Sequence, residues 1–342
     1  MEKYVGFIKK HRKKFIIFFI LINIIAIVGL FRIKINPDFN IFMPEKSEYK
    51  KTMDEMNKYF SNSEQVTFLM KSGNKEINIE NLRMFRTFQA YLEKQEDINF
   101  VNGPTPQKIP VGRQEIDLSD INEDNINMIK NYYQSMGSLT NIYQKDNDTY
   151  ASFSIFPKND FSNNNINEIE SYLNDNNINF FATGDLYMQQ KIIDYIILIL
   201  LFIPPTALVL LLFVFKTQMG NMKATFFSVL PAGIAALWTM GIIGWSGLQV
   251  SIITVLAPIF TIVIGSADGL HFVSHFQEAL KEGKERISSI ITTLNMVGIP
   301  MIITTVTSMV GFLSLLVMNT EAILDLALFA SLGIFLAGIA TW

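Results

Sequence analysis

One carboxylate lies inside a stretch that is otherwise apolar enough to cross a membrane. Asp268 belongs to the run Ile-Gly-Ser-Ala-Asp-Gly-Leu-His at 264–271. A charged side chain within a span costs on the order of 2.5–3.5 kcal/mol on insertion scales, so it is a functional candidate by default. Burial and hydrogen bonds tune the balance between the charged and neutral forms of a carboxyl group. Asp268 is therefore predicted to take up and release protons. The alternative is that it lies near the lipid headgroups and faces water.

Two histidines follow this carboxylate at helical spacing. His271 comes three residues after Asp268 and is predicted to be its hydrogen-bond neighbour or, alternatively, an interfacial residue. His271 and His275 are four apart, with Glu278 beyond, which would place two imidazoles on one helix face. No third ligand or cysteine supports a metal ion there, so no metal site is predicted.

Small and hydroxyl-bearing residues accompany the carboxylate. Gly265 and Gly269 leave a notch on one helix face, where another backbone can approach closely. The fifth predicted span contains a cluster of hydroxyl-bearing residues. Hydroxyls within a helix often bond to the backbone carbonyls of their own helix, and this use is expected for about half of the cluster. Two of its members share a face and could hydrogen-bond an acidic neighbour on the preceding span. The cluster consists of Thr304, Thr305, Thr307 and Ser308, of which Thr304 and Ser308 share the face.

The rest of the chain contains no motif of an enzyme. It has no nucleophile–base pair, phosphate loop or HExxH sequence, so neither an enzymatic activity nor a cofactor is predicted. The absence of cysteine excludes disulfides and thiolate metal sites but leaves the redox compartment undetermined. A net charge of −3 without a basic stripe gives no sign of nucleic-acid binding.

Uncharged runs long enough to cross a bilayer position these residues. A hydrocarbon core of roughly 30 Å needs about 20 apolar helical residues, and six such runs occur. The run from 224 to 267 is too long for one span, and Trp245-Ser246-Gly247 is the predicted break within it. Counted from Val250, Asp268 would lie about 27 Å along the fourth span, in its cytoplasmic half. The predicted spans are 15–32, 195–215, 224–245, 250–276, 297–318 and 323–342.

Lysine and arginine set the predicted orientation, because they are retained on the cytoplasmic side. The basic N-terminus, residues 1–14, is expected to be cytoplasmic, and six crossings then place every short basic loop on the same side. Residues 33–191 must therefore lie outside the cytoplasm. The first span lacks a cleavage site, which favours an uncleaved anchor over a signal peptide. The predicted location is the cytoplasmic (inner) membrane of a bacterium or archaeon.

The polar segment 33–191 contains the same pattern twice. A strand, a helix and a second strand are expected over about 64–104 and again over about 148–184, and each unit closes on a similar pentapeptide, Asp-Ile-Asn-Phe-Val at 97–101 and Asn-Ile-Asn-Phe-Phe at 177–181. Two such units suggest a ferredoxin-like α+β module. A further helix is expected near 122–136. The predicted fold is thus a six-span helical membrane protein with an extracytoplasmic porter-like domain between spans 1 and 2, and a membrane domain at 192–342.

This arrangement resembles the first half of a resistance–nodulation–division (RND) transporter, in the MmpL, hopanoid-exporter and Patched-like branch. The resemblance rests on GSADGLHFVSHFQEAL at 265–280 and ITTVTSMVGFLSLL at 303–316. It implies that Asp268 is the proton-relay aspartate, supported by Gly265, Gly269, Thr304, Thr305 and Ser308.

The chain departs from the family pattern at two places in the first motif. Many relatives have Asp-Tyr or Asp-Asp where this chain has Asp268-Gly269, and His271 could substitute for the second relay group. Phe276-Gln277-Glu278 stands where Arg-Glu is usual. Spans two to six also resemble the sterol-sensing domain, which implies affinity for lipidic molecules and membrane lipids.

The implied function is proton-motive-force-driven export of hydrophobic or lipidic molecules by this chain or by the larger protein whose N-terminal half it is. Relatives usually carry a second homologous half, and the chain is expected to stop at Trp342 because a gene fragment stops there. If it is complete, it is expected to pair with a copy of itself or a sister chain, fourth span against fourth span, where Gly265 and Gly269 would allow close approach. The alternative function is a non-transporting lipid or sterol sensor or assembly protein. A protein-export auxiliary subunit matches the motifs less well.

Overall fold

The chain folds into two compact units. The computed structural model describes residues 2–44, 46–59, 65–73, 77–111, 114–145, 148–158 and 161–342. One unit, called the membrane unit below, comprises Met1–Glu55 and Ile192–Trp342. The other, called the inserted domain, comprises Met56–Lys191.

Six helices of the described residues are long and apolar enough to cross a membrane. Each corresponds to one predicted span, and three of them begin ten or more residues before the predicted apolar run. The predicted break after the third span lies where that helix ends, with Gly247 in the left-handed region at φ +75°. The helices are α1 (Glu2–Leu30), α6 (Asp185–Met219), α7 (Met222–Ser246), α8 (Ala257–Lys281), α9 (Arg286–Leu313) and α10 (Glu321–Thr341).

The fourth span begins later than the sequence predicted. Residues 249–250 form a short strand, β9 (Gln249–Val250), which pairs in parallel with β1 (Lys34–Ile35). A turn follows in which the backbone N–H of Ser251 donates to Thr254 Oγ1 at 2.6 Å. The helix starts only at Ala257, with Pro258 in its first turn. A backbone N–H in the first turn has no partner within the helix, so proline costs no hydrogen bond there. The predicted start at 250 was wrong because hydropathy does not distinguish a buried strand and turn from the first turns of a helix.

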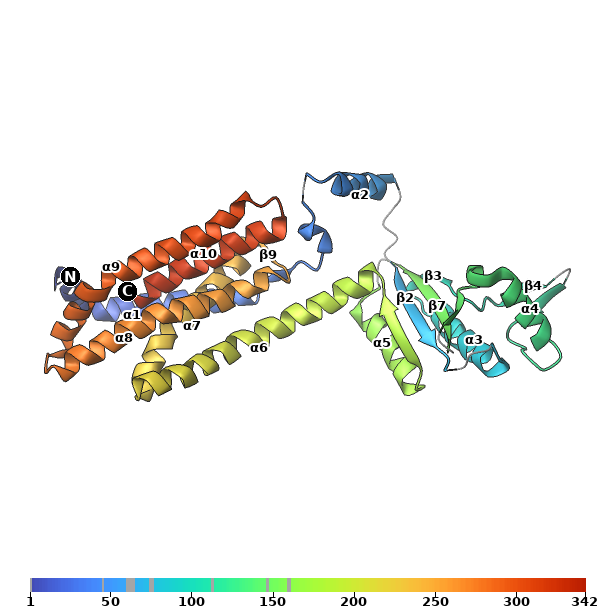
Figure 1. Cartoon of the computed structure of the whole chain (residues 1–342), viewed down its shortest axis with the longest axis horizontal. Helices are drawn as coiled ribbons and strands as arrows, with labels where there is room; N and C mark the ends of the chain where they lie inside the picture. The colour runs from blue at the N-terminus through green and yellow to red at the C-terminus, as the bar shows by residue number, and fades with distance from the viewer. Residues whose placement is uncertain are drawn as a thin grey trace. The chain divides into compact units, whose positions relative to one another are not determined.

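Helix α7 is central in the membrane unit. It packs against α1, α8 and α10, and α10 also packs against α8 and α9 (Figure 1). The contact between α1 and α7 is close because it is made by small residues, glycine and alanine. A Cβ added at Gly241 would overlap Ala26, and one added at Gly244 would overlap the carbonyl oxygen of Gly29. Only 6% of the apolar stretch of α9 is buried, and the same holds for α6.

The inserted domain contains a five-stranded sheet in its described part. Two strand–helix–strand units contribute four of its strands, in the order β3-β7-β2-β8 with antiparallel neighbours, and β6 (Ile142–Lys145) pairs with β7. The units are β2 (Val66–Lys71), α3 (Ile79–Glu93) and β3 (Ile98–Asn102), then β7 (Asp148–Pro157), α5 (Asn163–Asp175) and β8 (Asn179–Thr183).

The segment between these two units has structure that the sequence did not reveal. A separate hairpin joins β4 (Lys108–Val111) to β5 (Gln114–Asp117). Helix α4 (Ile126–Met136) lies where a helix was expected near 122–136. The remaining helix, α2 (Glu48–Tyr59), precedes the sheet and was not predicted.

One hydrophobic core joins the sheet to α3 and α5. Alternate residues of β2 and β7 are buried, as the period of a half-buried strand requires. Phe88 of α3 meets Phe153 of β7 edge to face at a ring-centroid distance of 4.9 Å, and Tyr91 of α3 stacks on Tyr172 of α5 at 3.9 Å. Both helices therefore cover the same face of the sheet (Figure 1).

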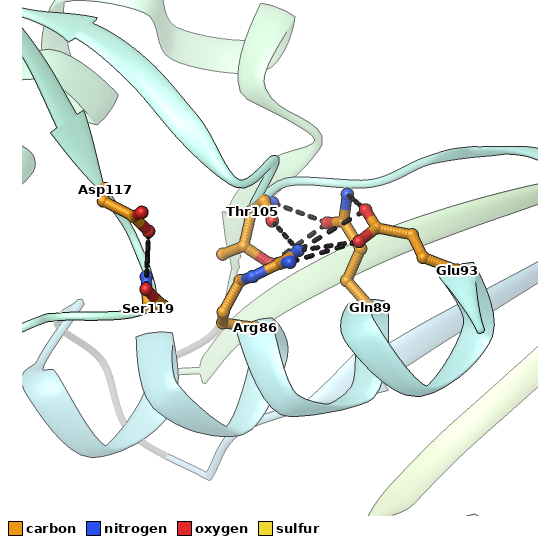
Figure 2. A network of polar contacts seen from close by, with 6 residues as sticks. All are labelled: Arg86, Gln89, Glu93, Thr105, Asp117 and Ser119. Carbon is orange, nitrogen blue, oxygen red and sulfur yellow. Dashed lines mark hydrogen bonds and ion pairs between the residues drawn. The ribbon is translucent and has the colours of Figure 1, made fainter.

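A polar network fastens the segment after β3 to α3. Figure 2 shows the guanidinium of Arg86 between the carboxylate of Glu93 and the Thr105 backbone carbonyl, to which it donates at 2.9 Å. The buried Gln89 side-chain oxygen accepts from both the backbone N–H and the hydroxyl of Thr105, at 2.8 and 3.0 Å. Nearby, the hydroxyl of Ser119 and, to a lesser extent, its backbone N–H lower the pKa of Asp117 by bonding to its charged form.

The inserted domain is expected to lose stability in alkali through Tyr133. This phenol is buried and donates to the Pro104 carbonyl at 2.7 Å, and burial raises its pKa. A raised folded-state pKa gives stability that is complete below the unfolded value of about 10 and is lost as the pH rises above it. The free energy of unfolding, measured as a function of pH, should fall more steeply in the alkaline range for the wild type than for Tyr133→Phe. Parallel curves would show that Tyr133 is not the group responsible.

Candidate functional site

Asp268 lies near the middle of its helix. It is 11 residues from Ala257 and 13 from Lys281, which is about 16 and 20 Å along the axis. The predicted distance of about 27 Å from the start of the span was wrong, because the span starts at 257 rather than 250. The side chain is half-buried. Along the helix, the carboxylate thus lies away from both ends.

Two threonines of α9 hydrogen-bond this carboxylate. The hydroxyl of Thr304 donates to Asp268 Oδ1 at 3.2 Å, and that of Thr305 donates to Oδ2 at 3.4 Å. Thr304 Oγ1 also lies 2.8 Å from the backbone carbonyl of Met301. Because a hydroxyl has a single hydrogen, Thr304 can donate to the carboxylate or to its own helix, but not fully to both.

The other two hydroxyls of the cluster lie elsewhere. Thr307 donates to backbone carbonyls of its own helix, at Ile303 and Thr304, which is the use expected for part of the cluster. Among the described hydrogen bonds none joins Ser308 to Asp268, so the expected contact of this residue with the acid is not present. The structure brings together Asp268, Thr304 and Thr305.

Within the described residues, neither His271 nor His275 forms a hydrogen bond with the carboxylate. His271 is exposed on α8, one turn after Asp268, and no hydrogen bond between the two side chains is found within the described part of the chain. His275 instead pairs with Glu278, with 2.8 Å between Nδ1 and Oε2. His271 is therefore close in sequence to the carboxylate without being its hydrogen-bond partner.

The glycine notch is already filled within the membrane unit. A Cβ at Gly269 would overlap the carbonyl oxygen of Ser228 on α7, and one at Gly265 would lie 2.6 Å from Cβ of Ala337 on α10. The prediction that these glycines face another copy was wrong. Sequence spacing identifies a small-residue face but cannot say which helix occupies it.

The exposed face of α8 lies beside the carboxylate. Val263, Ala267 and His271 follow one another at four-residue spacing and are exposed, and Val263 is 51% exposed. Thr304 is exposed on the neighbouring helix. One side of the Asp268 cluster is thus not covered by the described residues of this chain.

Sequence reasoning missed the contribution of α10 to this site. Ala337 packs against Gly265, and Gly338 lies so close to Thr305 that an added Cβ would be 3.0 Å from its hydroxyl oxygen. Helix α10 therefore supports both α8 and α9 at the level of the carboxylate. The adjacent small residues Ala337 and Gly338 were the available signal, because such residues mark close helix contacts in membranes.

Comparison with known proteins places the chain in a family. A family model described as the MMPL family matches residues 151–342, more than half of the chain. The chain belongs to the MMPL family. This match covers the second strand–helix–strand unit except the first residues of β7, together with helices α6 to α10, and so includes Asp268 and both threonines. With its six apolar helices, this MMPL protein is a multi-pass membrane protein, as the sequence predicted, and it resembles the N-terminal half of an RND-type transporter.

One curated relative has a similar length. The MMPL protein is 21% identical over 333 residues to MJ1562 of Methanocaldococcus jannaschii, which is named only as a candidate membrane protein. The match covers 92% of this chain and 84% of the relative. The remainder of the relative is too short to contain a second copy of the six-helix unit.

Proposed function

We propose that this MMPL protein is a proton-driven exporter of hydrophobic or lipidic molecules, or the N-terminal half of one. The observation that carries the proposal is a carboxylate near the middle of a candidate membrane-spanning helix that accepts hydrogen bonds from two threonines of a neighbouring helix. Such intramembrane carboxylates mark proton pathways in pumps and transporters. Membership of the MMPL family supports the same function.

Protonation of Asp268 would change how α8 and α9 are joined. A charged carboxylate only accepts hydrogen bonds, whereas the neutral group also has an O–H donor. In the neutral state Thr304 would donate to the Met301 carbonyl within α9, and the carboxyl would donate to a threonine oxygen. The direction of the hydrogen bonds between the two helices thus depends on one proton, and the helices have a different preferred contact in each state.

Thr305→Val is expected to impair transport more than Thr307→Val. Valine keeps the shape of threonine and removes the hydroxyl, and of these two threonines Thr305 contacts the carboxylate whereas Thr307 bonds to its own helix. A hydrogen bond to a charged group contributes about 1.5–3 kcal/mol, so we expect Thr305→Val to lower proton-driven transport by about tenfold or more. Transport rates in proteoliposomes test this, and equal rates for the two variants would exclude a role for the Thr305 hydroxyl.

We further propose that the inserted domain is an extracytoplasmic, ferredoxin-like porter domain. The support is its strand order, in which the first and third strands of a duplicated strand–helix–strand pattern lie together in the centre, with both helices on one face. The basic residues of the N-terminus and of the short loops support a cytoplasmic N-terminus. The proposed location is the cytoplasmic (inner) membrane.

A second copy, or a homologous half, is proposed to cover the exposed side of the Asp268 cluster. The face of Val263, Ala267 and His271 supports this, because a half-buried carboxylate in hydrocarbon needs polar partners or water. The relative MJ1562, which has no room for a second six-helix unit, supports pairing between separate chains. Two Asp268 groups brought together in this way would titrate as a coupled pair.

Cysteine cross-linking tests the proposed pairing. Ala267 is exposed beside Asp268 and is the position chosen for the cysteine, because its neighbour Ser266 is buried within the membrane unit. Ala267→Cys in membranes should form a disulfide-linked dimer efficiently. Phe213→Cys, on the 69% exposed side chain of α6, is the lipid-facing control and should not. Equal yields at the two positions would contradict pairing through α8.

An imposed proton gradient separates the exporter from a lipid sensor on the same scaffold. Proteoliposomes are loaded with a panel of fluorescent hydrophobic compounds, and their release is followed with and without the gradient. The exporter should release at least one compound faster when the gradient is present, and a protonophore should remove the effect. A sensor should give the same release in all conditions.

A further inference from the structure

Four ionisable side chains follow one another along the second half of α8 and are called the ionisable stripe below. Asp268, His271, His275 and Glu278 are spaced by three, four and three residues. With 3.6 residues per turn, this spacing places them within an arc of about 80° on one helix face, about 4.5, 6 and 4.5 Å apart along the axis. Residues at such spacings are neighbours on a helix surface. The stripe therefore runs from the candidate proton relay to a point near Lys281, the last residue of α8.

The members of the stripe are at least partly accessible. His271 is exposed and lies on the side of the Asp268 cluster that the described residues of this chain leave uncovered. The side chain of His275 is 33% exposed, and its Nδ1 lies 2.8 Å from Oε2 of Glu278, which is exposed. Ionisable residues are rare in membrane spans, where they face protein or a water-filled cavity and mark proton pathways. Two of the three histidines of the whole chain lie in this stripe.

The helices that pack against α8 offer a proton no other carrier toward the same end. These helices are α7, α9 and α10, all of whose residues are described. The only charged or titratable side chains of α7 and α9 are Lys223 and Arg286, which lie in their first turns. Those of α10 are Glu321 and Asp325, in its first two turns. Within this chain, a proton that leaves Asp268 toward the end of α8 thus has the stripe and water as its route.

Imidazole groups are suited to carry a proton along such a route. A neutral histidine accepts a proton at one ring nitrogen and can release one from the other, and its ordinary pKa lies close to neutral pH. No hydrogen bond joins His271 to Asp268 among the described residues, so transfer between these two side chains requires a bridging water. The exposed position of His271 leaves room for that water.

We propose that His271, His275 and Glu278 carry protons between Asp268 and the proposed cytoplasmic end of α8. This inference deepens the proposed function and rests on it. The proton that Asp268 releases binds one nitrogen of His271 through water, and the other nitrogen releases a proton toward His275. His275 passes a proton to Glu278, which releases it to the aqueous phase. Each group then returns to its starting protonation state, and no other reactant is needed.

Gradient-driven transport and proton movement by the whole protein in proteoliposomes test the stripe. His271→Gln removes a titratable group at an exposed position, where the change should not disturb folding. A positioned proton-transfer group contributes about 100-fold or more, and because water can replace part of the route we expect both rates to fall by about tenfold. His11→Gln is the matched control, because His11 lies in α1 with its ring nitrogen 3.1 Å from the Phe7 carbonyl oxygen. This variant should keep the wild-type rates.

Chemical rescue distinguishes a proton carrier from a residue with a structural role. His271→Ala should be slowed like His271→Gln, and imidazole added on both sides of the membrane should raise its transport rate several-fold. Imidazole should not restore transport by Asp268→Asn, because this variant lacks the first group of the route. That comparison also shows whether imidazole alone changes release from the vesicles.

The outcomes separate this inference from the proposed function. Wild-type transport by Asp268→Asn would contradict the proposed function itself. If Asp268→Asn is inactive and His271→Gln transports at the wild-type rate, the proposed function stands and the route through His271 is overturned. A loss in folded His271→Ala that imidazole does not relieve, or equal losses in His271→Gln and His11→Gln, would also overturn this route.

Discussion

Asp268→Asn is expected to abolish proton-driven transport while leaving the protein folded. The amide has the size of the carboxyl group and can still bond to Thr304 and Thr305, but it cannot take up or release a proton. Loss of a positioned proton-transfer group costs about 100-fold or more, and we expect the transport rate to fall on that scale. The measurement is gradient-driven release of hydrophobic compounds from proteoliposomes.

The matched control is a second carboxylate of the membrane unit. Asp325 lies near the start of α10 and is half-buried like Asp268, but no described hydrogen bond joins it to the threonines of α9. Asp325→Asn should therefore retain most of the transport rate. If both variants transport alike, or if Asp268→Asn keeps the wild-type rate, Asp268 is not the relay.

Gly269→Ala is expected to be the most damaging methyl addition in α8. The new Cβ would overlap the carbonyl oxygen of Ser228, which belongs to the backbone of α7 and cannot move aside by changing rotamer. Forcing extra atoms into a well-packed contact costs about 1–3 kcal/mol, and the backbone contact places this variant at the upper end. The free energy of unfolding, measured by denaturant titration in detergent micelles, should fall by this amount.

Gly311→Ala is the control for the same chemical change. This glycine lies in α9, and apart from its two chain neighbours and the nearby backbone of its own helix no atom lies within 4 Å of the position that its Cβ would take. Alanine also has a higher helix propensity than glycine, so Gly311→Ala should be neutral or slightly stabilising. If Gly269→Ala proved as stable as Gly311→Ala, movement of α7 would have to relieve the overlap, and the prediction would be wrong.

The six spans, and the position of Asp268 within one of them, could be predicted because the local hydropathy of the chain is sufficient to identify a span. Long uncharged runs must be helices in a bilayer, since every backbone polar group must be paired there. The start of α8 could not be predicted in this way. Residues 249–256 are as apolar as the helix that follows, and only pairing with β1, more than 200 residues earlier, makes a strand of Gln249–Val250.

Partners between helices were the part of the site that sequence predicted least well. The hydroxyl cluster was expected near the acid, but Thr304 and Ser308 were chosen because they share a helix face, whereas Thr304 and Thr305 make the contact. Two adjacent residues can reach the two oxygens of one carboxylate when α9 meets α8 at that level. Likewise, Gly265 and Gly269 were assigned to a partner chain, although α7 and α10 fill their notch. Rotation and depth of neighbouring helices are set by packing, which periodicity does not contain.

Proton movement coupled to transport tests the central claim most directly. A pH-sensitive dye is trapped in proteoliposomes containing the wild-type protein or Asp268→Asn, and each compound that the wild type transports is added in turn. The proposed mechanism predicts that these compounds accelerate proton movement across the membrane in the wild type and not in Asp268→Asn. Equal proton movement in the two proteins, or transport by the wild type without any proton movement, would contradict a proton relay at Asp268.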